Sequence, residues 1–469
     1  MIKELHQKLI NKEITAQELI ESYFKIIKEK DPKINAFITL TEDSAFIEAR
    51  KIDEKIKKGE EIGLLEGIPY AVKDNILTKG IKTTAGSKIL ENYIGSYNAT
   101  VINKLKEQKS IMVGKTNMDE FAMGSSTENS AFFPTKNPWD LSRVPGGSSG
   151  GSASAIASEM CVFSLGSDTG GSIRQPAAFC GVVGFKPSYG AVSRFGLIAL
   201  ASSLDVIGPF AKNVEDVEIV FKAICGKDDM DSTSLNIKPL ELQVKGFKLG
   251  LPKEYFLKGL NKEIEIKIKE AVGKIEKKIG KTMEVSLPHT AYALPCYYII
   301  LPAEVSANLA RYDGMRYSQI SNLKSQISNL RELYFKTRGK GLGSEPRRRV
   351  ILGTYVLSKG YYEAYYKKAQ QVRKVIIDEF EKTFKEVDFL LTPTTPTSPF
   401  ELGEKTQDPL SMYLSDIFTV AVNIAGLPGI NIPCGFTKDN LPIGFQIIGP
   451  RYSDFNLLKI AKEIEKIIY

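Results

Sequence analysis

The chain has 469 residues, of which 43% are hydrophobic and 25% charged, and this balance excludes a disordered protein and predicts a large buried core. Its net charge of +8 is a mild excess for that length, and the short basic clusters are mixed with acidic residues, so they predict solvated surface rather than a nucleic-acid-binding face. The five cysteines are scattered without a Cys-x-x-Cys pair, which argues against a disulfide scaffold and against a zinc site.

Two helices are predicted in the first 60 residues. Residues 15–18, Thr-Ala-Gln-Glu, have the form of a capping box, and apolar residues follow them at helical spacing. A second helix is expected over residues 42–58.

Strands and helices alternate after this point. We expect strands that include Lys73 and residues 110–114, 161–167, 246–251, 388–392, 429–433 and 443–448. We expect helices near residues 99–108, 213–224, 262–278 and 454–468. This alternation is typical of an α/β fold with a large mixed or mainly parallel sheet covered by helices on both faces.

Residues 290–385 are predicted to be almost wholly helical and are rich in tyrosine. A repeat within residues 318–330 is interpreted as a tolerated surface insertion, because seven residues make two helical turns. No linker divides the sequence, so we expect one domain over residues 1–469 with a helical insert at about 290–385. The sequence has no signal peptide and no apolar run near the roughly 18 residues that span a bilayer, which predicts a reducing, cytoplasmic location.

Two Gly-Gly-Ser turns, at residues 146–148 and 170–172, each precede an apparent helix. Such turns leave backbone N–H groups free to bind a phosphate or a transient oxyanion. A phosphate loop requires Gly-x-x-x-x-Gly-Lys-Ser/Thr, and no lysine follows either turn. The pattern therefore favours an oxyanion site.

Ser172 is the candidate nucleophile in the second turn, and the alternative is that it only caps the following helix. A serine nucleophile needs a base, and the two histidines, His6 and His289, lie far from the turns in sequence. Asp168 is expected to face away from Ser172 if the turn is tight. Lys73 follows an apolar run, so burial could keep it neutral, although a lysine that ends a strand usually lies at the surface.

Three motifs in order resemble the amidase signature family: Val-Lys-Asp at 72–74, Gly-Gly-Ser-Ser-Gly-Gly-Ser-Ala at 146–153, and Gly-Ser-Asp-Thr-Gly-Gly-Ser-Ile-Arg-Gln-Pro-Ala at 166–177. The resemblance implies the amidase-signature α/β fold. Together the three motifs are far more specific than any one of them.

The resemblance also implies roles for three side chains. Ser172 is expected to be the acyl-forming nucleophile, Ser148 the bridging serine, and Lys73 the neutral base that draws the proton away through Ser148. In the family a cis peptide bond precedes the bridging serine, here Gly147–Ser148. The expected oxyanion-hole amides are those of Thr169, Gly170, Gly171 and Ser172.

Similarity to one subgroup of the family extends over essentially the full length. The subgroup comprises the glutaminase subunits of tRNA-dependent amidotransferases of the GatCAB type. Its matching segments are 114–126, 307–314, 360–369, 412–416 and 422–429. The first of these segments resembles the lining of the acyl pocket, and the predicted substrate-binding residues in it are Met123, Gly124 and Ser125.

Free glutamine carries an α-ammonium and an α-carboxylate, so its site needs one anion and one cation. By resemblance, Asp416 and Arg349 supply them. The alternative for each is a surface charge or an ion pair. Arg347 and Arg348 adjoin Arg349 and leave the register of the arginine open, and Pro346 beside them could displace it.

The resemblance implies hydrolysis of glutamine through an acyl-serine and supply of ammonia for converting Glu-tRNA(Gln) to Gln-tRNA(Gln), or Asp-tRNA(Asn) to Asn-tRNA(Asn), a ligase reaction in protein biosynthesis. The implied partners are GatB-like and GatC-like subunits in a heterotrimer. The complex uses ATP and Mg²⁺ at the partner, the tRNA is bound through the partner, and no cofactor or metal is expected in this chain.

Two alternatives remain. The first is a free-standing amidase acting on small or fatty amides, which would have an apolar acyl pocket without a charge pair. The second is a catalytically silent RNA-binding or scaffold protein, for which an intact set of Lys73, Ser148 and Ser172 has no use.

Overall fold

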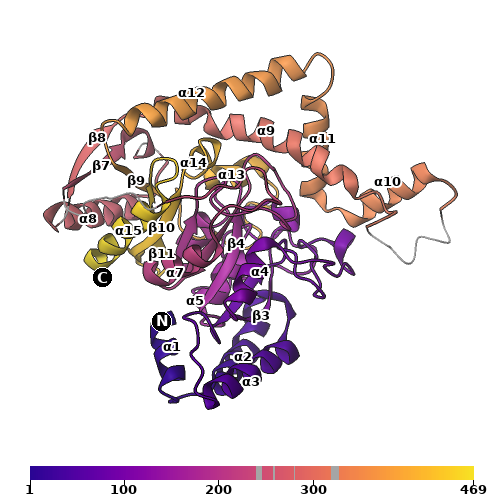
Figure 1. Ribbon diagram of the computed structural model, residues 1–469. Coiled ribbons are helices and arrows are strands. Elements are labelled where there is room, and N and C mark those ends of the chain that lie inside the picture. The colour runs from indigo at the N-terminus through magenta and orange to yellow at the C-terminus, as the bar shows by residue number, and fades with distance from the viewer. Residues whose placement is uncertain (239–245, 257–258, 279, 318–326) are drawn as a thin grey trace.

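The computed structural model describes residues 1–469 apart from 239–245, 257–258, 279 and 318–326 (Figure 1). The strands of this described part form an 11-stranded sheet with the order β1-β3-β2-β4-β6-β5-β10-β11-β9-β7-β8. In chain order the strands are β1 (Phe37–Leu40), β2 (Pro69–Lys73), β3 (Ile111–Thr116), β4 (Phe163–Asp168), β5 (Val183–Lys186), β6 (Val206–Ala211), β7 (Phe247–Pro252), β8 (Gly280–Val285), β9 (Phe389–Pro393), β10 (Gly429–Phe436) and β11 (Pro442–Ile448).

The sheet is mixed. Strand β2 lies between β3 and β4 and runs parallel to both, whereas β4, β6, β5, β10, β11 and β9 pair antiparallel in turn. In the β2–β4 ladder Val72 is opposite Leu165. Because parallel strands end at the same edge of a sheet, Lys73 at the end of β2 and Asp168 at the end of β4 lie at one edge.

Helices pack on the sheet in two groups. Helices α5 (Gly150–Ala157) and α6 (Arg174–Cys180) contact each other, α5 packing on β2 and β4 and α6 on β10 and β11. Helices α7 (Val214–Ile224), α8 (Lys262–Lys278) and α15 (Asp454–Ile468) form a second group on β5, β6 and β10. Strands β4, β5 and β6 are buried along their whole length, as expected for a sheet covered on both faces.

Four helices, α1 (Ile2–Ile10), α2 (Ala16–Ile34), α3 (Glu42–Lys57) and α4 (Thr100–Glu107), come before β3 in the chain. Two short helices, α13 (Pro409–Tyr413) and α14 (Val420–Ile424), lie between β9 and β10 in the chain, and α14 packs against α9 and α12. The capping box predicted at Thr15 and Glu18 is present at the start of α2. No helix in the described ranges is both long enough and apolar enough to cross a membrane.

The stretch predicted to be a helical insert contains α9 (Ala293–Asn308), α10 (Leu330–Gly341), α11 (Ser344–Val356) and α12 (Lys368–Thr383). Helix α9 packs against α11 and α12, and in Figure 1 this group lies at the top while α10 extends to the right, away from the sheet. Most of the repeat predicted as a surface insertion, residues 318–326, lies outside the described residues.

The predicted strands are present, but four strands were not expected. Strand β1 has only four residues, β5 follows α6 after a two-residue gap, β6 contains Gly208-Pro209, and β8 is a largely exposed edge strand. Strands β1 and β5 are too short to show a clear run, β8 is mostly polar, and the apolar residues of β6 are interrupted by a Gly-Pro pair that is typical of a turn. Strands β5 and β6 make the centre antiparallel, so the expectation of a mainly parallel sheet is wrong and that of a mixed sheet is confirmed.

Candidate active site

Lys73 ends β2 inside the protein, where three serines surround its amine. Its Nζ lies 2.7 Å from Ser148 Oγ, 2.8 Å from Ser149 Oγ and 2.9 Å from Ser167 Oγ. Ser148 and Ser149 come from the turn before α5, and Ser167 lies on the neighbouring strand β4. The structure therefore brings the predicted base and the predicted bridging serine into direct contact.

The Lys73 side chain is completely buried. Burial lowers the pKa of Lys73 to about 7, although the carboxylates of Asp119, Asp168 and Asp205 act in the opposite direction. The alternative of a surface lysine is wrong. Since its contacts are neutral hydroxyls rather than a carboxylate, the amine can be uncharged near neutral pH and accept a proton.

The peptide bond between Gly147 and Ser148 is cis, as the resemblance implied. The amide of Gly147 donates to Gln175 Oε1 at 2.9 Å, and the carbonyl of Ser148 accepts from the amide of Asp119 at 3.3 Å. Gln175 lies on α6, three residues after Ser172. The two glycine turns are thus held together by a side chain from the third motif, residues 166–177.

Ser172 lies in the turn between β4 and α6. Helix α6 begins at Arg174, and its N-cap position is Ile173, without a side-chain cap. The alternative that Ser172 only caps the helix is therefore wrong. No hydrogen bond joins Ser172 Oγ to another residue in the described ranges, and the side chain is 9% exposed.

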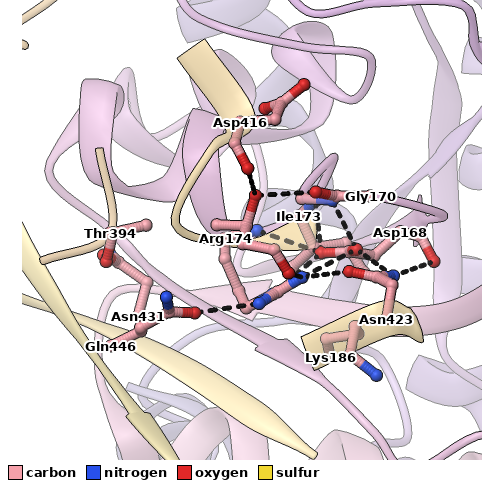
Figure 2. A network of polar contacts seen from close by, with 12 residues as sticks. Asp168, Gly170, Ile173, Arg174, Lys186, Thr394, Asp416, Asn423, Asn431 and Gln446 are labelled. Atoms are coloured by element: carbon pink, nitrogen blue, oxygen red, sulfur yellow. Dashed lines mark hydrogen bonds and ion pairs between the residues drawn. The ribbon is translucent and has the colours of Figure 1, made fainter. Parts of the chain in front are cut away.

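Asp168 shapes the turn that carries Ser172 (Figure 2). Its carboxylate accepts hydrogen bonds from the amides of Gly171 at 2.8 Å and Ile173 at 3.0 Å, and it pairs with the buried Arg174 guanidinium at 3.2 Å. Burial alone would raise the pKa of Asp168, but Arg174 holds it down at about 2. The carboxylate is thus a fixed acceptor and unsuited to serve as a base for Ser172.

The turn presents backbone amides at the predicted oxyanion site. The Gly171 amide is used by Asp168, so the amides left without a partner among the described residues are those of Thr169, Gly170 and Ser172. Glycine is required at Gly171, where φ is +144° and a Cβ would lie 2.2 Å from Thr419 Oγ1. Only glycine therefore fits at this position of the turn, and the three free amides remain for a bound carbonyl oxygen.

Asp416 lies beside the same turn. Thr419 Oγ1 donates to the carbonyl of Gly170 at 2.6 Å and also contacts the carbonyl of Asp416 at 3.0 Å, so this threonine joins the two segments. The Asp416 carboxylate accepts from the hydroxyl of Ser125 through Oδ2, while Oδ1 is buried and has no partner among the described residues. Burial raises the pKa of Asp416 to about 7. A buried carboxylate oxygen without a donor is suited to bind a ligand ammonium.

The three adjacent arginines have different environments. Arg349 is buried, its Nη2 donates to the carbonyl of Gly124 at 3.5 Å, and its guanidinium lies 4.9 Å from the ring centroid of Tyr298. Arg347 is exposed, and Arg348 pairs with Glu345. The structure therefore favours Arg349 as the arginine that faces the acyl pocket.

Arg349 also has an internal partner that the sequence did not indicate. Its Nε donates to Glu345 Oε1 at 2.7 Å, one helical turn earlier, and the hydroxyl of Tyr413 donates to the same oxygen at 2.7 Å. Helix α11 begins at Ser344, so Pro346 occupies the first turn and does not displace Arg349. Nη1 of the guanidinium has no hydrogen-bond partner among the residues that the structure describes.

The predicted pocket residues Met123, Gly124 and Ser125 follow a tight turn. Met123 and Ser125 are buried, and a Cβ at Gly124 would lie 3.0 Å from the amide nitrogen of Ser148. Sequence reasoning missed Ser149, Ser167 and Thr419. Their types are ordinary for loops and strands, and the one signal that could have indicated Ser149 and Ser167 is their position within the motifs at 146–153 and 166–177.

Comparisons with known proteins agree with this geometry. The Amidase family matches residues 18–458. The chain is 55% identical over 470 residues to the A subunit of glutamyl-tRNA(Gln) amidotransferase of Carboxydothermus hydrogenoformans, covering 99% of this chain and 96% of that protein. It is 56% identical over 465 residues to the protein of the same name from Thermodesulfovibrio yellowstonii, covering 98% and 95%.

A solved structure is similar as well. The crystal structure of the A subunit of glutamyl-tRNA(Gln) amidotransferase from Thermotoga maritima superposes with a TM-score of 0.79 at 45% identity, covering 96% of this chain and 91% of that one.

Proposed function

This chain belongs to the amidase family, and on that premise we propose that it is the glutamine-hydrolysing subunit of a tRNA-dependent amidotransferase. The observation that carries the proposal is the 2.7 Å contact between the buried Lys73 amine and Ser148 Oγ beside the Ser172 turn. The names of the relatives supply the substrate class.

In the proposed acylation step, Ser172 Oγ attacks the side-chain amide carbon of glutamine. The Ser172 proton passes to Ser148, and the Ser148 proton passes to the neutral amine of Lys73. The negative charge that develops on the carbonyl oxygen is stabilised by the free amides of the turn from Thr169 to Ser172. The proton returns to the leaving nitrogen, the C–N bond breaks, and ammonia departs from a glutamyl ester of Ser172.

Hydrolysis uses the same relay. Water loses a proton to Ser148 and Lys73 as it attacks the ester, the bond between the acyl carbon and Ser172 Oγ breaks, Ser172 Oγ takes the proton back, and glutamate is released. Because Asp168 already fixes the turn through Gly171, the amides need no rearrangement when the oxyanion forms.

The ammonia serves a second reaction in the proposed complex. The relatives are named as one subunit of a larger enzyme, which supports a multi-subunit assembly, and we propose GatB-like and GatC-like partners. The partner holds the tRNA and activates its glutamyl or aspartyl group with ATP and Mg²⁺, and ammonia then forms the amide. This chain contributes the ammonia and holds neither nucleotide nor metal in the proposal.

Charge near the nucleophile distinguishes glutamine from a neutral or fatty amide. Asp416 Oδ1, which has no partner in the described part of the chain, supplies an anion beside the Ser172 turn, and Arg349 supplies a cation beside the Gly124 segment. A fatty-amide pocket has no use for buried charges of this kind. The arrangement therefore favours the amidotransferase over a free-standing amidase.

Replacing Asp416 by asparagine should lower kcat/KM for glutamine by about 10²-fold, because a buried ammonium without its anion costs about 2–5 kcal/mol. A short primary amide without charged groups should be hydrolysed as by the wild type. Asp439→Asn, at an exposed position, is the matched control. Equal losses on both substrates would contradict an ammonium-binding role for Asp416.

The pH dependence should differ between charged and neutral substrates. Lys73 must be neutral to accept a proton, and Asp416 must be ionised to bind ammonium; both have a pKa of about 7. Activity therefore rises with pH through this range for both substrates. Between about pH 5.5 and pH 7, log kcat/KM should rise with a slope approaching about 2 for glutamine and about 1 for the neutral amide. Parallel profiles would show that only one of the two groups controls glutamine hydrolysis.

The complex itself is tested by co-purification of this chain with two partners, followed by a glutamine-dependent amidation assay on Glu-tRNA(Gln) and Asp-tRNA(Asn). The same assay decides which tRNA is served. A chain that co-purifies with the partners yet releases no glutamate in the complex would revive the scaffold alternative.

A further inference from the structure

Glu120 is a buried carboxylate that the proposed mechanism does not use. It is 1% exposed and lies at the start of a 3₁₀ turn, η2 (Glu120–Ala122). Its Oε1 accepts from the hydroxyl of Ser87, and its Oε2 accepts from the amide of Gly343 at 2.9 Å. Because a buried carboxylate is costly unless it is hydrogen-bonded, these two contacts are the ones that hold it.

Gly343 is the N-cap residue of α11, and it has no side chain with which to cap the helix. Glu120, 223 residues earlier in the chain, accepts instead from the amide of this N-cap residue, which is the bond that a glutamate at the third helical position makes in a capping box. A carboxylate at this end of a helix also compensates the partial positive charge of the helix dipole. A Cβ on Gly343 would lie 2.4 Å from Glu120 Oε2, so glycine is needed for the approach.

The segment of Glu120 contacts α11 a second time. After Glu120 the chain passes through Phe121 and Ala122, whose φ angles are 49° and 63°, and reaches Gly124. The Gly124 carbonyl accepts from Arg349 at 3.5 Å. From Gly343 to Arg349 the helix advances about 9 Å, so α11 is attached to the acyl-pocket segment at two points about 9 Å apart.

We propose that Glu120 is a positioning residue for substrate specificity: by capping α11 it sets the position of Arg349 beside the acyl pocket. The inference rests on the proposed function, because it assigns to Arg349 the α-carboxylate of glutamine. Glu120 itself does not touch the substrate. Its removal should weaken glutamine binding and leave the chemistry of Lys73, Ser148 and Ser172 unchanged.

The experiment compares Glu120→Ala, Glu120→Gln and Arg349→Ala in the chain purified with any subunits that accompany it. We expect Glu120→Ala to raise KM for glutamine about 10-fold with kcat within about 3-fold of wild type, and to leave a neutral short amide unaffected. Glu120→Gln keeps an oxygen acceptor for the Gly343 amide and should restore KM. The double variant Glu120→Ala/Arg349→Ala should have nearly the same KM for glutamine as Arg349→Ala alone, because Glu120 affects glutamine binding only through Arg349. Glu91→Ala, at a half-exposed glutamate paired with Lys88, is the control.

The outcomes separate this inference from the proposed function. If Arg349→Ala leaves KM for glutamine unchanged, the binding role of Arg349 fails and the inference fails with it. If Arg349→Ala raises KM and Glu120→Ala does not, the inference alone is overturned. Equal effects of Glu120→Ala on both substrates would also overturn it, since they indicate a general loss of structure. If Glu120→Ala does not fold, Gly343→Ala, which pushes its Cβ against Glu120, should produce the same selective rise in KM, and an unselective effect there would overturn the inference.

Discussion

Ser172→Ala should abolish glutamine hydrolysis, with kcat reduced by at least about 10⁴-fold. Removal of a serine nucleophile that acts with a base as one unit costs this much or more, because the remaining groups have nothing to acylate. The variant should fold normally, since Ser172 Oγ makes no hydrogen bond within the described part of the chain and does not cap α6. Glutamate release measures the loss of activity, and the midpoint of thermal unfolding shows whether the variant folds as the wild type does.

Trapping of the acyl-serine intermediate tests the role of Ser172 directly. Hydroxylamine intercepts an acyl-serine and forms γ-glutamyl hydroxamate, so the wild type should produce this compound and Ser172→Ala should not. Ser154→Ala is the matched control, because Ser154 is another buried serine of the same region, on α5, and its hydroxyl donates to the Lys136 carbonyl at 3.3 Å. Undiminished glutamate release by Ser172→Ala would remove Ser172 as the nucleophile.

Lys73→Met should lower kcat for every amide substrate by about 10³-fold or more, since methionine fills a similar volume without an amine to accept the proton. The loss should be the same for glutamine and for a neutral amide, in contrast to the selective effects at Asp416 and Glu120. Steady-state kinetics on both substrates, with a check of folding by circular dichroism, measure it.

Two further lysines, Lys115 and Lys186, are as buried as Lys73, and burial lowers their pKa values to about 8 and about 7. A lowered pKa alone therefore does not identify the base. Lys186 Nζ donates to the Pro187 carbonyl at 2.9 Å. Lys186→Met should retain activity and the rise of activity through pH 7. If Lys186→Met removed that rise, the pH dependence would belong to Lys186 and not to Lys73.

Much of the secondary structure was predictable, because the spacing of apolar residues in a long segment indicates a helix or a strand without knowledge of the rest of the chain. The α2 capping box needed no tertiary information, because its residues lie in one short segment. The burial of Lys73 was left open by its apolar run, since a lysine that ends a strand usually lies at the surface, and the sheet decided it. Strand β6 could not be found in the same way. Its Gly208-Pro209 pair is typical of a turn, and only its two antiparallel neighbours, β4 and β5, make it a strand.

The residues of the site also fall into those that the motifs indicated and those that only the tertiary structure reveals. The motifs indicated Lys73, Ser148 and Ser172, because their residue types and order are specific. Thr419 could not be found, since a threonine before a helix has no local signal that relates it to the site. The choice of Arg349 among three arginines also depended on tertiary structure, because burial against Gly124 and Tyr298 separates it from its neighbours.

The turn that carries Ser172 is completed by residues from the far end of the chain. Asn423 donates to Asp168 across 255 residues, and Arg174 binds Gln446 across 272. When only the first 400 residues have been synthesised, neither Asn423 nor Gln446 is present to complete these contacts. Contacts so remote in sequence form late, because closing long loops is entropically costly. Glutamine-consuming activity is therefore tied to completion of the polypeptide, and truncated translation products lack a finished site.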